Sequence, residues 1–234
     1  MTKAQSANLL NLDLAENHVD ITTGFIGGSI VIFGTRKRDA DDLIVIMEGP
    51  RHDVVVRQKK NVFGAWVNRE SVTFSDAPLY YDYAISSENV LQTMEARAKE
   101  NYRIGIENLL PRPKDKKESP DKVLPFQRAF IRERQSGGFY PEAGKPVAFL
   151  DENFFKVFLN VPANVPIGEY TVRALLVKNG KVIREKEKTL KIAQTGFSAG
   201  VYNFAKDHGL IYALICVFIA FLSGWLSNKI TRRN

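Results

Sequence analysis

The sequence has few of the residues that build disulfides and metal sites. Its single cysteine, Cys216, excludes a disulfide or a thiolate metal cluster within this sequence. The three histidines, His18, His52 and His208, are far apart, and none has a second ligand at the spacing of a zinc motif. We therefore expect no metal and no other cofactor.

Motifs for catalysis and nucleotide binding are also missing. The glycine-rich "GFIGGS" at 24–29 precedes a predicted strand rather than a helix, and it lacks the Lys-Ser/Thr pair of a phosphate-binding loop. No serine has the flanking glycines of a hydrolase nucleophile. "DADD" at 39–42 lacks the later glycine and glutamate of a calcium loop. The sequence predicts no catalytic residues and a protein that is not an enzyme.

One long apolar run dominates the C-terminal end. Residues 209–228 carry no charge, and about 20 such residues are what a helix needs to cross a bilayer. Tyr212 and Trp225 lie near its ends, as interfacial aromatic residues do. The alternative, a central helix of a soluble core, would normally keep a polar stripe, which this run lacks. We predict a juxtamembrane segment at 195–208, a transmembrane helix at 209–228 and a tail at 229–234.

Charge on either side of this run predicts its direction. Lys229, Arg232 and Arg233 follow it, whereas the preceding 206–208 ("KDH") carries one lysine beside an aspartate. The positive-inside rule places the tail in the cytoplasm and the larger N-terminal part in the periplasm of a bacterial inner membrane. The first residues show no basic segment followed by an apolar core, so no signal peptide is visible. Either the signal has been removed and the start replaced, or this is a tail-anchored protein facing the cytosol; the charges favour the first.

Small residues mark one face of the predicted membrane helix. Ala213, Ala220, Gly224 and Ser227 are spaced seven, four and three apart, so they lie close together on the helix. Ala220 and Gly224 form a small-xxx-small pair, which lets a second helix approach closely. We therefore expect an integral membrane protein subunit as a partner, in addition to the lipid bilayer.

The region before the anchor reads mainly as strands. Runs of four to eight residues rich in Val, Ile, Phe and Tyr fill 19–86, with Gly27-Gly28 as a predicted turn. Strands return from Lys145 onward, and Asn179-Gly180 predicts a hairpin with a type I′ turn. Trp66 is expected to fill the core between two sheets, with stacking on a ligand as the alternative.

Two helices interrupt the strands. The first is predicted to start at Ser86-Ser87 and to end before Pro111. Its apolar face comprises residues three or four apart: Leu91, Met94, Ala98 and Tyr102. The second is predicted from Leu124 to Gln135, with Phe126 and Phe130 on one face and Gly137-Gly138 as its stop.

These patterns together predict the fold class. We expect a mainly β protein: an immunoglobulin-like β-sandwich at 19–194, with a helical insertion at about 87–136. An N-terminal extension, 1–18, precedes it, and one C-terminal transmembrane helix follows it.

A net charge of +7 suggests an anionic partner or simply a solvated basic surface. Basic residues cluster at 36–38 and again at Arg57, Lys59 and Lys60. Neither cluster is interleaved with the aromatic residues that stack on bases, so we expect no nucleic acid. Anionic lipid headgroups suit these clusters better.

Several stretches together resemble a known family. They are "FIGGSIVIFG", "DLIVIMEGP", "VVVRQKKNVFGAWVN", "PLYYDYAIS", "VPANVPIGEYTVRALLVKNGKVI" and "GWLSNKITRR". From about Val19 onward, the chain resembles a family of predicted alphaproteobacterial transmembrane proteins of unassigned function. The resemblance implies a signal peptide ahead of an exported domain, and it brings no catalytic residues.

The leading hypothesis is a periplasmic domain on a single membrane helix that acts as an accessory or assembly subunit of a membrane protein complex. The alternative is a periplasmic ligand-binding module with a groove near Trp66, Tyr80 and Tyr81. An enzyme is the third possibility.

Overall fold

The computed structural model describes residues 10–37, 42–62, 64–195 and 197–231. Within these ranges the side chains of 60–62, 65, 66, 68, 197–199, 203 and 227–231 lie outside the description. The chain forms two compact units: residues up to 19 together with 25–193, and residues 20–24 together with 194–234.

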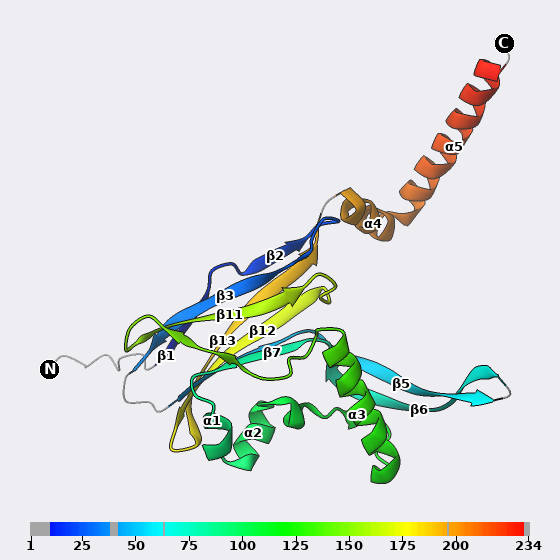
Figure 1. The fold of residues 1–234 in the computed structure, drawn as a ribbon. Helices are drawn as coiled ribbons and strands as arrows, with labels where there is room; N and C mark the ends of the chain where they lie inside the picture. The colour runs from blue at the N-terminus through cyan, green and yellow to red at the C-terminus, as the bar shows by residue number, and fades with distance from the viewer. Residues whose placement is uncertain (1–9, 38–41, 63, 196, 232–234) are drawn as a thin grey trace. The chain divides into compact units, whose positions relative to one another are not determined.

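The strands of the described residues form three sheets (Figure 1). The first has the order β1-β3-β11-β10: β1 (Leu10–Leu14), β3 (Gly27–Arg36), β11 (Phe154–Pro162) and β10 (Ala148–Phe149). The second has the order β2-β13-β12-β4-β7-β9: β2 (His18–Ile21), β13 (Lys181–Gln194), β12 (Gly168–Lys178), β4 (Asp42–Glu48), β7 (Tyr81–Ile85) and β9 (Lys145–Pro146). The third has the order β5-β6-β8: β5 (Arg51–Val62), β6 (Ala65–Pro78) and β8 (Arg112–Pro113).

Strand β4 is buried on both of its faces. Its residues Leu43 to Met47 are all 0% exposed, although neighbouring side chains of a strand point in opposite directions. Ile44 and Ile46 belong to a core that also contains Phe126 and Phe130 of the helical layer. The "LIVIM" run is therefore continuous rather than alternating because the second sheet is covered on both sides.

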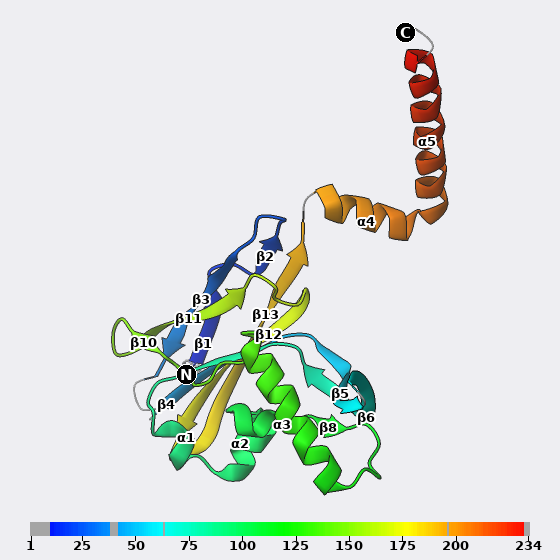
Figure 2. The same cartoon turned by 45° about the vertical axis from the view of Figure 1, so that its right-hand side comes forward.

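The helical layer comprises α1 (Val90–Thr93), α2 (Ala96–Tyr102), the 3-10 helix η1 (Ile106–Leu109) and α3 (Pro120–Ser136). Figures 1 and 2 both show α1, α2 and α3 grouped together, with α3 beside β5 and β6. The four apolar residues expected on the face of a first helix do contact this core, with Met94 buried and the other three partly buried.

The single first helix that the sequence predicts is wrong, because the chain breaks it twice. Met94 is extended (φ −71°, ψ 142°) and Arg103 is left-handed (φ 53°). At the first break the Glu95 N–H donates to the carbonyl of Gly180, in the distant β12–β13 turn, at 3.3 Å. This tertiary hydrogen bond stands in place of the helical one, and local periodicity does not reveal it.

Helix α3 and the last hairpin follow the sequence closely. Phe126 and Phe130 of α3 are buried as predicted, although the helix begins four residues early, because Pro120 suits its first turn. The hairpin prediction is confirmed: Asn179 (φ 51°) and Gly180 (φ 73°) have the two positive φ angles of a type I′ turn.

Two features near the start differ from expectation. Gly27-Gly28 are not a turn but open β3, opposite Pro162 and Val161 of β11. Strand β1 lies in the segment assigned to an extension; its LNLDL residues alternate buried and exposed and pair with β3. That alternation is a short but readable strand signal.

The prediction of a mainly β fold with one C-terminal apolar helix is confirmed, with 45% strand and 28% helix. The immunoglobulin-like arrangement stays a prediction. In the second unit, α4 (Phe197–Asp207) precedes α5 (Gly209–Thr231). Residues 209–226 of α5 have a mean hydropathy of 2.3, none of them is buried, and the helix is long and apolar enough to cross a membrane.

Candidate functional site

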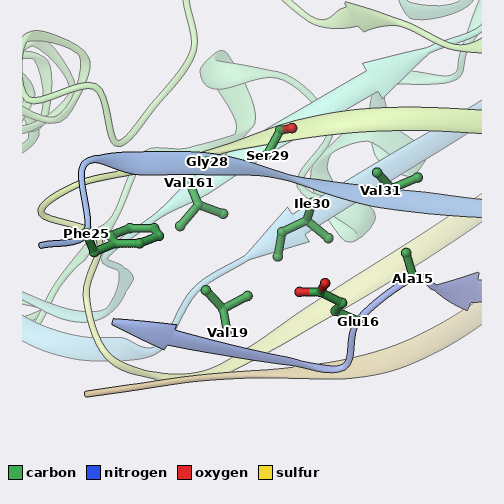
Figure 3. A pocket seen from close by; sticks show the side chains of 9 residues that line it. All are labelled: Ala15, Glu16, Val19, Phe25, Gly28, Ser29, Ile30, Val31 and Val161. Atoms are coloured by element: carbon green, nitrogen blue, oxygen red, sulfur yellow. The ribbon is translucent and has the colours of Figure 1, made fainter. Parts of the chain in front are cut away.

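A cavity of about 240 Å³ opens between the first and second sheets. Figure 3 shows Val161 and Ile30 pointing from the upper strands toward Val19 and Glu16 below them. Phe25 closes one end. The cavity is lined by Ala15, Glu16, Val19, Phe25, Gly28, Ser29, Ile30, Val31 and Val161.

Glu16 supplies the only ionisable side chain among these lining residues. It lies in the segment between β1 and β2, and its carboxylate reaches between Val19 and Ile30 (Figure 3). Apolar walls with one acidic group suit a small apolar molecule that carries a hydrogen-bond donor or a positive charge. The sequence analysis missed Glu16, because nothing in its neighbourhood resembles a motif.

Asp82 is a buried acid whose oxygens are all engaged. Its Oδ2 accepts from Lys145 Nζ at 2.5 Å, from the Asn160 N–H at 3.2 Å and from the Tyr80 hydroxyl at 3.4 Å. Its Oδ1 accepts from the Tyr83 N–H at 2.9 Å. Because Asn160 belongs to β11 and Asp82 to β7, this carboxylate joins the first two sheets, which is a structural role.

Glu48 is the second buried acid and is paired with two arginines. Its carboxylate lies 2.5 Å from Arg51 and 3.3 Å from Arg173, and Arg51 also reaches Asp76 at 2.8 Å. Burial opposes the charged form of Arg51 most strongly, but the hydrogen bonds and charges of Glu48 and Asp76 together outweigh it and raise the pKa of Arg51. The opposite charges compensate one another between residues of β4, β5 and β12, which is a structural role.

The two tyrosines expected at a groove lie in the interior instead. Tyr80 is 2% and Tyr81 0% exposed. The Tyr80 hydroxyl also donates to the carbonyl of Asn160, and the Tyr81 hydroxyl donates to the carbonyl of Arg103 at 2.9 Å. Burial raises the pKa of both hydroxyls. The expected groove is therefore wrong at these two residues, because β7 is covered by the helical layer and by β11.

The other predicted residues are less fully described. Trp66 pairs with Asn61 across the β5–β6 ladder, and its side chain lies outside the described part. On α5, Ala213, Ala220 and Gly224 are exposed, whereas only the backbone of Ser227 and Lys229 is described. Arg232 and Arg233 lie outside the described residues.

A second concave surface runs between β5 and α3, with a volume of about 630 Å³. Arg57 and Lys59 of the second basic cluster line it, together with Arg128 and Arg132 of α3. The sequence analysis missed these α3 arginines, although their i, i+4 spacing places them on one face of the helix.

Within the described residues, no group of three or more His, Cys, Asp or Glu side chains could hold a metal ion. The titratable groups described above are instead engaged in structural pairs or stand alone. The arrangement offers two candidate binding surfaces, the cavity beside Glu16 and the concave surface between β5 and α3.

The comparisons agree with the resemblance seen in the sequence. Residues 9–233 match the model of the family described as "Putative transmembrane protein (Alph_Pro_TM)". No protein with a curated description matches the sequence significantly. Since the match covers nearly the whole chain and the chain carries the expected C-terminal apolar helix, the protein belongs to the alphaproteobacterial Alph_Pro_TM family of transmembrane proteins.

Proposed function

We propose that this protein is a non-catalytic accessory or assembly subunit of a membrane protein complex. Helix α5 anchors it, and the first of the two compact units (residues up to 19 together with 25–193), here called the strand-rich unit, lies in the periplasm. The observation that carries the proposal is the exposure of α5. None of residues 209–226 is buried in the described part of the chain, and their mean hydropathy is 2.3. Such a surface needs lipid or another membrane helix around it.

Gly224 favours a helix partner over lipid alone. Glycine in a helix interior costs about 1 kcal/mol relative to alanine. A Cβ placed on Gly224 would meet nothing within 4 Å in the described chain, so no contact within this molecule requires a glycine there. Close approach of a second helix at Gly224 and Ala220 would account for the small residues.

Co-purification tests this proposal directly. The full chain, extracted from its native membrane in a mild uncharged detergent, should elute with one or more other integral membrane proteins, identified by mass spectrometry. The double variant Ala220→Leu/Gly224→Leu should lose them. Ile215→Leu/Phe218→Leu, on the opposite side of α5, is the matched control. A wild-type chain that elutes alone, or a partner retained by both double variants, would contradict the proposal.

The periplasmic orientation rests on the charges that flank α5. Lys229, Arg232 and Arg233 follow the apolar run, against Lys206 and the adjacent Asp207 before it. Protease added to spheroplasts should digest the strand-rich unit and leave a C-terminal tag intact. Protection of the strand-rich unit until the membrane is permeabilised would reverse the orientation.

The cavity beside Glu16 favours a second candidate, a ligand-binding module. Most of its lining residues are apolar, the exposed Glu16 is the one acid among them, and its volume of about 240 Å³ suits a small molecule. Native mass spectrometry of the full chain should then reveal a bound small molecule that Glu16→Gln releases and that Glu169→Gln, a change at an exposed residue of β12, retains. Identical masses for the purified protein and the bare chain would remove this candidate.

A further inference from the structure

The concave surface between β5 and α3, here called the basic groove, has cations along both walls. Arg57 and Lys59 line the β5 side, and Arg128 and Arg132 line the α3 side. All four side chains are exposed, and no acidic partner within the described residues pairs with any of them. Asp121 is the only acidic residue in the lining, so the groove carries a net positive charge.

The groove also has an apolar side. Leu124 lines it and is 41% exposed, although it lies on a helix whose opposite face is packed into the core. Pro125 and Ala129 of α3 and Val56 of β5 add to this apolar surface. A ligand here would meet positive charge and a hydrocarbon surface together, whereas a free inorganic anion would use only the charges.

One wall of the groove is the free edge of a sheet. Among the described strands, β5 is the terminal strand of the β5-β6-β8 sheet and pairs with β6 alone. Four consecutive residues, Val56 to Lys59, line the groove. Val56, Arg57 and Gln58 precede the register shift between Gln58 and Lys59, so their side chains alternate between the two faces of the strand, and a groove lined by all three runs along the edge of β5 rather than over one face. Such an edge presents unpaired backbone donors and acceptors.

We propose that the basic groove binds an extended acidic segment of a partner protein, which adds as a strand to the free edge of β5. Backbone hydrogen bonds to β5 supply affinity, and alternate acidic side chains meet Arg57, Lys59, Arg128 and Arg132. An apolar residue on the same face of the added strand packs on Leu124, which shares one face of α3 with Arg128 and Arg132. The proposal names a contact surface for the partner implied by the proposed function and rests on it only for the existence of that partner.

Cations on an edge strand also have a purely protective use, because they hinder edge-to-edge association. Cations that serve only this purpose would keep other strands away and would not bind an acidic strand in a fixed register. Lipid headgroups could likewise neutralise the four charges, but they have no use for a strand edge. Edge protection and lipid binding are therefore the two alternatives that the experiment must distinguish from strand addition.

The experiment uses the full chain in uncharged detergent micelles and a labelled peptide of four Glu-Val repeats as the probe. Fluorescence anisotropy should show binding that weakens as salt is raised. Arg128→Glu/Arg132→Glu, both exposed on α3, should weaken binding at least about tenfold, because two attractive contacts become repulsive. Arg97→Glu/Lys186→Glu changes the net charge equally at exposed sites outside the groove lining and should leave binding within about twofold of wild type.

Strand addition is tested by N-methylating the peptide on either its valine or its glutamate nitrogens. Only one of these sets can donate to β5, so one methylated peptide should lose about tenfold or more in affinity while the other binds nearly as the parent. Equal binding or equal loss by the two peptides would overturn the strand-addition proposal. Binding of Lys-Val repeats as strongly as Glu-Val repeats would overturn it too, as would vesicles of phosphatidylglycerol that bind at the groove when the acidic peptide does not.

This outcome is separable from that of the proposed function. Peptide binding with no co-purifying membrane protein would support the groove proposal and contradict the proposed membrane complex. A membrane protein that still co-purifies with the Arg128→Glu/Arg132→Glu variant, together with no peptide binding by the wild type, would support the membrane complex and contradict the groove proposal.

Discussion

The strand-rich unit and helix α5 differ in the exposure of their large apolar side chains. In β4, five successive apolar residues are each 0% exposed. In α5, Phe218 and Phe221 are 64% and 77% exposed. The hydrophobic effect requires both sets to leave water. The first set is buried by the rest of the chain, whereas the second needs a bilayer or a partner helix.

The strand-rich unit and α5 also differ in how they accommodate polar and charged side chains. The strand-rich unit buries Asp82 and Glu48 and provides each with hydrogen-bonding or charged partners. The apolar run of α5 has no charged side chain, and the Ser223 hydroxyl donates to the Ala220 carbonyl of its own helix at 2.9 Å. One region can neutralise a buried charge through tertiary contacts, and the other can only avoid having one.

Removing a phenyl ring from each region should give the largest contrast. Phe130 is 1% exposed, with ring centroids of Phe74 and Tyr140 at 6.2 and 6.1 Å. Phe130→Ala should therefore lower the free energy of unfolding of the strand-rich unit by about 3–5 kcal/mol. Phe218→Ala should change it by less than about 0.5 kcal/mol. Urea titration of the full chain in detergent, followed by circular dichroism, measures both; similar losses would show that α5 packs on the unit.

Removing the buried carboxylate that joins the sheets should cost nearly as much. Asp82→Ala leaves Lys145 and two backbone N–H groups without their acceptor, so we expect a loss of about 3 kcal/mol in the free energy of unfolding. The matched control is Asp53→Ala, which removes a solvent-exposed partner of Lys114 and should have a much smaller effect. A comparable loss of stability in the control would mean that burial does not determine how much each ion pair contributes to the free energy of unfolding.

A charge placed in α5 should act on membrane insertion and leave the strand-rich unit unchanged. Ile219→Lys should disfavour insertion by about 2.5–3.5 kcal/mol, because Ile219 lies near the middle of the apolar span. Less of the chain should then remain in the membrane pellet after alkaline carbonate extraction, while its urea midpoint stays the same. Tyr202→Lys, in α4 before the span, is the control and should be retained like the wild type.

The smallest effect concerns alkaline pH and is absent at neutrality. Burial raises the pKa of four interior tyrosines above the ordinary value of 10.0: Tyr80, Tyr81, Tyr140 and Tyr170. In the unfolded chain they ionise near pH 10, so the stability from keeping them neutral is complete below that pH and is lost as the pH rises further. Tyrosinate absorbance of these residues should appear only together with loss of the circular dichroism signal. Their ionisation in a still-folded chain would contradict the burial.

The sequence could predict elements whose signal is local. The Asn179-Gly180 turn, the Phe126 and Phe130 face of α3 and the apolar span of α5 each depend on a few neighbouring residues. The break at Met94 and the burial of Tyr80 and Tyr81 depend on segments distant in the chain, since Gly180 meets Glu95 and β11 meets β7. The basic groove escaped sequence analysis for the same reason, because Arg57 and Arg128 are 71 positions apart and meet only across β5 and α3.

The sequence by itself therefore determined that the protein is mainly β with one C-terminal membrane-spanning helix, because hydrophobic periodicity, turn residues and an uncharged run of sufficient length are properties of the chain alone. Only the tertiary structure decided that the second sheet is covered on both faces, that the aromatic residues of β7 are core rather than surface, and that four cations from β5 and α3 line one groove. Burial and charge proximity are set by which distant segments pack together, and that is decided when the whole unit folds.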